Sequence, residues 1–145
     1  MSTVRKFKDF GWENVPVLAY KEGGPYKGVT RQILFDGEET LPAQWRYFEV
    51  EPGGHSTLER HEHIHYVLIL RGKGCCMVGG EISDIGEHDL IEVPSLKWHQ
   101  FRAAEDAPLG FLCLVSATRD RPQLPAEDDL AELNKSRAVA DFIRP

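Results

Sequence analysis

The sequence predicts an all-β sandwich or barrel that is followed by a short C-terminal helix. Short runs rich in β-branched and aromatic residues recur at close intervals, and glycine and proline separate them. No helical periodicity interrupts these runs before residue 120. The length is the third observation, because 145 residues fit one domain with a single core.

The apolar runs define about ten expected strands. The Gly79-Gly80 pair is typical of a tight hairpin between the sixth and the seventh of them. The run over residues 65–70 is apolar on both faces, so it should lie centrally in its sheet. In chain order, the expected strands cover residues 15–20, 29–35, 44–50, 56–61, 65–71, 74–78, 81–85, 89–93, 99–102 and 109–116.

The character of the chain changes after Pro122. Residues 125–133 place three acidic side chains in a first helical turn, and Leu130 and Leu133 follow three residues apart. This pattern favours a short helix. We therefore expect a barrel domain over residues 1–122 and a helical tail over residues 123–145 that packs on the barrel or forms a dimer contact.

Composition and charge argue against several functions. A net charge of −6 without a basic stripe argues against non-specific nucleic-acid binding, because affinity for phosphate backbones comes mainly from lysine and arginine. The longest apolar run, residues 66–70, is far shorter than the about 20 residues that span a bilayer. Residues 1–9 lack the apolar region of a secretory signal. With three cysteines (Cys75, Cys76 and Cys113) and no signal, we expect a cytoplasmic protein with no membrane or nucleic-acid partner.

Histidines are concentrated in one part of the chain. Of the six, His55, His61, His63 and His65 lie within eleven residues, and His99 lies in a later segment. Imidazole is the commonest metal-binding side chain and titrates near neutral pH. The cluster therefore predicts a metal site.

Strand geometry limits which of these side chains can share an ion. Glu59, His61, His63 and His65 have the same parity and would point to one side of a strand. Residues 61 and 65 would lie about 13 Å apart in a straight strand, so they can bind one ion only if the chain bends. Either three consecutive odd positions converge with strain, or a turn over residues 62–64 brings His65 back.

Two stretches of the chain resemble the sequence motifs of the cupin superfamily. The first motif, G-x5-H-x-H-x3-4-E-x6-G, is matched by Gly53-x5-Glu59-x-His61-x3-His65-x6-Gly72. The second motif, G-x5-P-x-G-x2-H-x3-N, is matched by His88-x5-Pro94-x-Leu96-x2-His99. The resemblance implies a double-stranded β-helix, or jelly-roll barrel, and a chain that turns between the second and third ligands of the first motif.

The chain departs from these motifs at several positions. Glu59 stands where the family usually has histidine, and His65 stands where it has glutamate. His88 and Leu96 replace the two glycines of the second motif, and Ala103 replaces its final asparagine. We expect His88 in a surface turn.

The resemblance implies that Glu59, His61, His65 and His99 ligate one divalent transition-metal ion. His63 is the alternative ligand if the register differs. Three nitrogens and one carboxylate suit iron, manganese, nickel, copper or zinc. Because His99 comes from a separate strand, the site forms only on folding.

The expected function is that of an enzyme whose small organic substrate is coordinated at the metal. The family implies dioxygenase, decarboxylase or lyase chemistry, and a homodimer. The alternative is a non-catalytic module whose metal is structural or whose barrel senses a ligand. No dedicated general base is evident, but Glu59 would serve if it is not a ligand.

Inward-facing strand residues should line the pocket around the metal. An aromatic lining would suit a partly apolar substrate better than a phosphate. The candidates are Trp45, Tyr47, Phe48, Met77, Trp98, Phe101 and Phe111.

Overall fold

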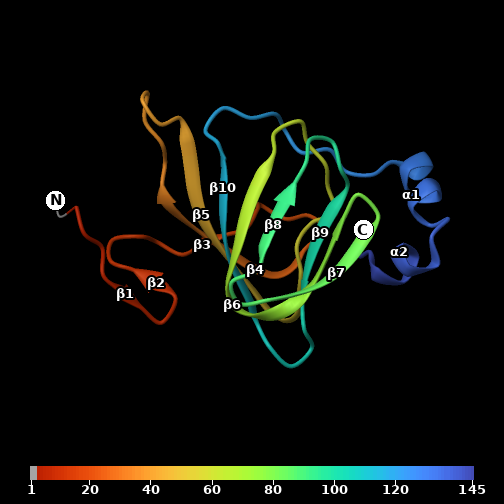
Figure 1. The fold of residues 1–145 in the computed structure, drawn as a ribbon, viewed down its shortest axis with the longest axis horizontal. Helices are drawn as coiled ribbons and strands as arrows, with labels where there is room; N and C mark the ends of the chain where they lie inside the picture. Colours follow the sequence, from red (N-terminus) through yellow and green to blue (C-terminus); the bar gives the residue numbers. More distant parts are fainter. Residues whose placement is uncertain (1–2) are drawn as a thin grey trace.

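The computed structural model describes residues 3–145, so the first two residues of the expected barrel domain lie outside the described part. Most of the chain is β-structure, with two short helices near its C-terminal end (Figure 1). The predicted all-β barrel with a short C-terminal helix is therefore confirmed. The strands are β1 (Phe7–Lys8), β2 (Gly11–Trp12), β3 (Leu18–Ala19), β4 (Lys27–Phe35), β5 (Ala43–His55), β6 (His65–Val78), β7 (Glu81–Gly86), β8 (Leu90–Val93), β9 (His99–Ala103) and β10 (Leu109–Ser116).

One antiparallel sheet closes on itself to form the barrel. β10 pairs with both β5 and β6, and β9 pairs with the same two strands. β6 also pairs with β7 and β8, which confirms that the run over residues 65–70 lies centrally. Gly79 and Gly80 form the predicted hairpin between β6 and β7, with φ of +62° and +91°.

Side chains that alternate along the strands fill the barrel. On β5 the buried face carries Gln44, Arg46, Phe48 and Val50, while Trp45 between them is exposed. The apolar members of this face join inward residues of the facing strands in one core cluster. Arg46 therefore places a charged guanidinium group on the buried face of β5.

Three strand boundaries differ from those expected. β5 continues through Pro52 and Gly53 to His55, and β6 is one strand where two were expected. Gly53 and Gly72 adopt φ of +75° and +74°, so these glycines bend the strands without ending them. Residues 56–61 are not a strand and make only isolated bridges, Glu59 with His99 and Arg60 with Gln123.

Three elements were not predicted from the sequence, namely β1, β2 and α2, because tertiary contacts and not periodicity stabilise them. β1 and β2 form a hairpin whose Trp12, with Phe10 beside it, packs on Tyr47 of β5. The first helix, α1 (Glu127–Leu133), lies within the expected range. A second, α2 (Arg137–Phe142), was not expected.

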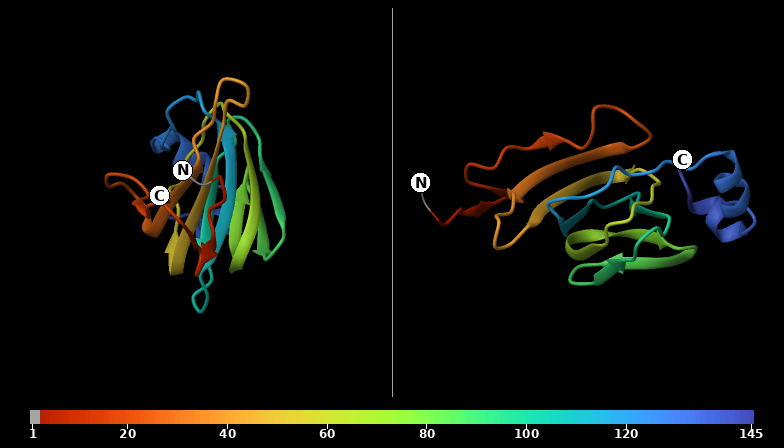
Figure 2. Two further views of the ribbon diagram at one scale, coloured as in Figure 1. Left: turned by 90° about the vertical axis from the view of Figure 1, so that its left-hand side faces the viewer. Right: turned by 90° about the horizontal axis from the view of Figure 1, so that it is seen from above.

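The two helices lie at one end of the barrel, opposite the β1–β2 hairpin (Figures 1 and 2). Val139, Phe142 and Ile143 pack on Leu58 and Met77 in a second apolar cluster. None of the helices in the described part of the chain is long and apolar enough to cross a membrane.

We expect Gly72→Ala to lower the free energy of unfolding by more than about 3 kcal/mol. Gly72 has a positive φ, and a Cβ there would overlap the carbonyl oxygen of Pro108, a backbone atom that cannot easily move. Gly80→Ala is the matched control, because its φ is also positive but nothing lies near its Cβ position. Gly80→Ala should cost only about 1–2 kcal/mol. Urea unfolding measures both values, and equal losses would contradict the steric explanation.

Candidate metal centre

The segment between β5 and β6 carries most of the histidines. The chain bends at residues 62–63 before β6 begins at His65. This bend confirms the second of the two geometries considered from the sequence, because His65 returns toward His61. His99, the first residue of β9, lies opposite Glu59 in a backbone bridge.

Three imidazoles converge as predicted. One nitrogen each of His61, His65 and His99 lies within 4.8 Å of the others. The ring centroids of His61 and His65 are 4.4 Å apart, and those of His61 and His99 are 4.8 Å apart. His61 and His99 are almost fully buried, so these nitrogens face one another away from bulk water.

Hydrogen bonds fix the orientation of two of the rings. His61 Nδ1 donates to the carbonyl oxygen of His63 at 2.7 Å, and His99 Nδ1 donates to that of Lys97 at 2.9 Å. Each ring therefore presents the lone pair of Nε2. The Nε2 atom of His61 is buried and has no hydrogen-bond partner among the residues that the structure describes.

The imidazoles are held in the neutral form that a metal requires. Burial lowers the pKa of His61 to about 4. Burial likewise lowers the pKa of His65 and His99, and the neighbouring His99 adds to the effect at His65. Neutral imidazoles with free lone pairs, and an unpartnered buried nitrogen among them, fit a divalent transition metal.

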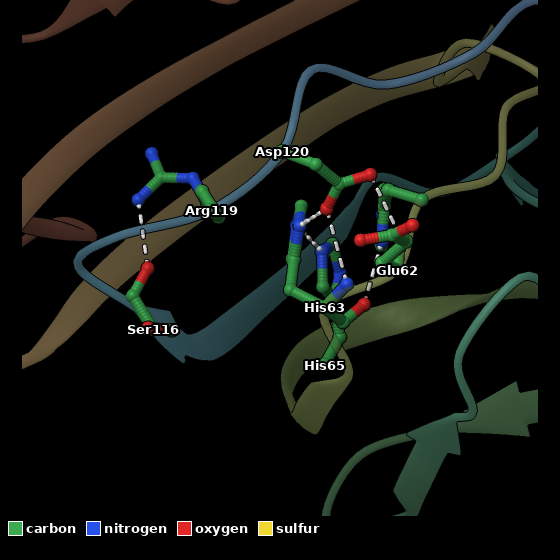
Figure 3. A network of polar contacts seen from close by, with 7 residues as sticks. Glu62, His63, His65, Ser116, Arg119 and Asp120 are labelled. Carbon is green, nitrogen blue, oxygen red and sulfur yellow. Dashed lines mark hydrogen bonds and ion pairs between the residues drawn. The ribbon is translucent and has the colours of Figure 1, made fainter.

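His63 lies beside the three converging rings. Its ring stacks on that of His61, with centroids 3.7 Å apart, and its Nε2 is 3.3 Å from Nε2 of His65. Nδ1 of His63 donates to Asp120, which also accepts hydrogen bonds from the backbone N–H groups of Glu62 and His63 (Figure 3). Asp120 therefore anchors the bend that brings His61 and His65 together.

We expect Asp120→Ala to weaken metal affinity by about 10–100-fold, as the loss of groups that orient ligands does. The variant would also lose about 1–3 kcal/mol of stability, because it removes the acceptor of two backbone N–H groups at the bend. Isothermal titration with Zn²⁺ and thermal unfolding measure the two effects. Asp106→Ala is the control, since Asp106 is exposed and pairs with the exposed Lys73, away from the bend. An unchanged affinity in Asp120→Ala would show that the bend does not depend on this contact.

The fourth predicted ligand, Glu59, is not brought together with the three imidazoles. Its side chain is buried, and Oε2 accepts a hydrogen bond from Lys21 Nζ at 2.8 Å. Tyr20 lies next to this pair, and burial and the charge of Glu59 raise its pKa far above its ordinary value. Glu59, Lys21 and Tyr20 all line the same cavity as the imidazoles.

The cavity has a volume of about 140 Å³. Of the predicted lining residues, Phe48, Phe101 and Phe111 are in place. Four others do not line it, because they pack against the N-terminal hairpin, against Phe35 or under the helices: Tyr47, Trp45, Met77 and Trp98.

Cationic side chains that the sequence reasoning missed also line the cavity: Lys21, Arg31, Arg46 and Arg119. A signal for two of them was available, because Arg46 shares the buried parity of Phe48 and Val50, and Arg31 shares that of Val29. Arg119 lies in the segment after β10, where no periodicity could place it.

His88 is exposed in a turn, as predicted. His88 and Leu96 have φ of +74° and +60°. Both therefore adopt the left-handed backbone conformation that glycine adopts easily, and the family motif has glycine at both positions.

Comparisons with known proteins agree with this geometry. Residues 46–115 match the Cupin_2 family model, described as a cupin domain. The 1-methylthio-D-xylulose 5-phosphate methylsulfurylase of Rhodospirillum rubrum is 55% identical over 136 residues, which cover 92% of this chain and 86% of that protein. A cupin 2 conserved barrel domain protein from Rhodopseudomonas palustris has a TM-score of 0.93 and 52% identity, over 99% of this chain and 100% of that one. A cupin-2 domain structure from Rhodospirillum rubrum has a TM-score of 0.87 and 54% identity, over 93% and 91%.

Proposed function

The chain belongs to the cupin superfamily, and from this premise we propose that it is a metal-dependent enzyme acting on 1-methylthio-D-xylulose 5-phosphate. The observation that carries the proposal is the convergence of three neutral imidazoles on a cavity, in a chain 55% identical to a methylsulfurylase of that substrate. The action expected is cleavage of the bond between carbon and the methylthio sulfur: a thiol co-substrate takes the methylthio group as a mixed disulfide, and the carbon next to the carbonyl group takes a proton.

In this proposal His61, His65 and His99 hold one divalent metal ion. The ion, when bound, supplies a Lewis acid that polarises an oxygen atom of the substrate. Three protein ligands leave coordination positions open, which is typical of catalytic and not of structural sites. The adjoining cavity gives a small molecule access to those positions.

Glu59 is the proton-transfer group in this proposal. Its carboxylate lines the same cavity but does not belong to the group of three converging imidazoles, and Lys21 holds Oε2 in an ion pair. The carbon that joins the carbonyl group to the methylthio group can lose or gain a proton, because the carbonyl group stabilises the resulting negative charge. A positioned carboxylate serves this proton transfer. Phe48, Phe101 and Phe111 limit the access of water from the apolar side of the cavity.

The test is incubation of the purified protein, with its metal retained, with 1-methylthio-D-xylulose 5-phosphate. A small-molecule fraction from a cell extract is added to supply any co-reactant. We expect the ³¹P NMR signal of the substrate to be replaced, and mass spectrometry to show a product without the methylthio group. Binding of the substrate without its conversion, in buffer and with the fraction, would instead favour the non-catalytic module.

A further inference from the structure

Three arginines lie together on the wall of the cavity that holds the imidazoles. Arg31 comes from β4, Arg46 from β5, and Arg119 from the segment after β10. Burial lowers the pKa of Arg119, and the positive charges of Arg46 and Arg31 lower it further, as expected for neighbours. The fold therefore concentrates positive charge from three separate parts of the chain at one place.

These three guanidinium groups have no anionic partner in the part of the chain that the structure describes. No carboxylate among residues 3–145 lies within ion-pair distance of any of them, whereas Lys21 of the same cavity is paired with Glu59. The Nε atoms of Arg31 and Arg46 are buried and lack any hydrogen-bond partner within the described part of the chain. Arg46 as a whole is only 8% exposed. An unpaired buried charge is costly, so such a cluster indicates a site for an anion.

The surrounding side chains hold the cluster in position. Arg46 lies over the ring of Phe48, at 4.8 Å from its centroid, and Nη2 lies 3.4 Å from Sγ of Cys113. Arg119 donates to the carbonyl oxygen of Ser116 and to Oε1 of Gln44, and it turns away from His63, the histidine that its neighbour Asp120 contacts (Figure 3). Two donations leave further N–H groups of Arg119 free for a ligand.

We propose that Arg31, Arg46 and Arg119 form a phosphate-binding subsite for the substrate. Guanidinium groups bind phosphate oxygens through paired, charge-assisted hydrogen bonds, and three such groups match a dianionic monoester. That the phosphate belongs to a ketose phosphate rests on the proposed function; the anion subsite itself rests on the arginines.

The subsite also sets the direction in which the substrate binds. Sγ of Cys113 lies 3.4 Å from Arg46 and 3.5 Å from Nδ1 of His65, so one side chain separates the cluster from the imidazoles. A phosphate held by the arginines leaves the carbon chain to extend toward the imidazoles. The carbonyl and methylthio end then lies at the metal, and the phosphate end lies away from it.

The experiment compares Arg31→Gln and Arg119→Gln with wild type, each protein carrying its metal. These two residues are half-buried, whereas loss of Arg46 would disturb the packing between Phe48 and Cys113. Arg137→Gln is the control, because it removes the same charge from an exposed position on α2. Calorimetry measures the binding of inorganic phosphate, and steady-state kinetics measure KM and kcat for 1-methylthio-D-xylulose 5-phosphate.

We expect each cavity variant to weaken phosphate binding by about tenfold or more, and Arg137→Gln to bind like wild type. KM should rise by a similar factor while kcat changes little, because the phosphate is remote from the reacting atoms. Wild type that fails to bind phosphate, or cavity variants that bind it equally well, would overturn the subsite. Phosphate binding that depends on the arginines, in a protein that leaves the substrate unchanged, would uphold the subsite and refute the proposed function.

Discussion

Replacing His61 by alanine is expected to weaken metal affinity by more than about 100-fold and to reduce turnover in proportion. His61 contributes the buried Nε2 that has no hydrogen-bond partner among residues 3–145, and its ring contacts those of both His65 and His99. Its removal takes away one of three nitrogens and opens a gap in the middle of the cluster. The remaining two imidazoles would hold an ion too weakly to keep it through purification.

His55→Ala is the matched control for this prediction. His55 belongs to the same histidine-rich run, but its Nδ1 contacts the backbone oxygen of Ser56, and it is not one of the three converging residues. Metal titration, turnover and thermal unfolding are measured for both variants. Loss of metal from His55→Ala, or full retention by His61→Ala, would contradict the assignment of the site.

Glu59→Gln is expected to lower turnover by about 10²–10⁴-fold while metal content stays at the wild-type level. The amide is nearly the same size as the carboxylate, but it neither accepts a proton at neutral pH nor pairs with the charge of Lys21. Because Glu59 is not one of the three converging residues and its Oε2 is paired with Lys21, the ion should not depend on it. Elemental analysis and initial rates separate the two roles.

Glu49→Gln provides the comparison for Glu59. Glu49 also pairs with a cation, Arg71, but it does not line the cavity. Its substitution should leave both turnover and metal content unchanged. If Glu59→Gln loses its metal, Glu59 is a ligand, as the family motif implied, and the proton-transfer role is refuted.

The strands that could be predicted from the sequence are those in which one face is buried along the whole run. The alternation through β5 and the doubly apolar start of β6 are local properties, and both strands were predicted at their cores. The ends were less predictable, because Gly53 and Gly72 bend strands where glycine commonly ends them. α2 depends on the burial of Val139 and Phe142 against distant residues, which periodicity does not reveal.

The candidate site also has residues that could be predicted from the sequence and residues that could not. His61 and His65 share one short segment, and a motif-like spacing adds His99, so these three were predictable from the sequence. The arginine cluster was not, because its members lie at positions 31, 46 and 119 and only the closed barrel brings them together. The expectation of a partly apolar substrate, and not a phosphate, followed from the aromatic residues alone. Three unpaired guanidinium groups favour a phosphorylated one.

The most direct test of the central claim is the metal content of protein purified without chelator and without a nickel affinity tag. Elemental analysis is applied to wild type and to the double variant His61→Ala with His99→Ala, and circular dichroism reports whether both are folded. We expect one equivalent of a divalent transition metal in wild type and a trace in the double variant. A wild type with only a small fraction of an equivalent, matched by a double variant that is equally well folded, would contradict the central claim.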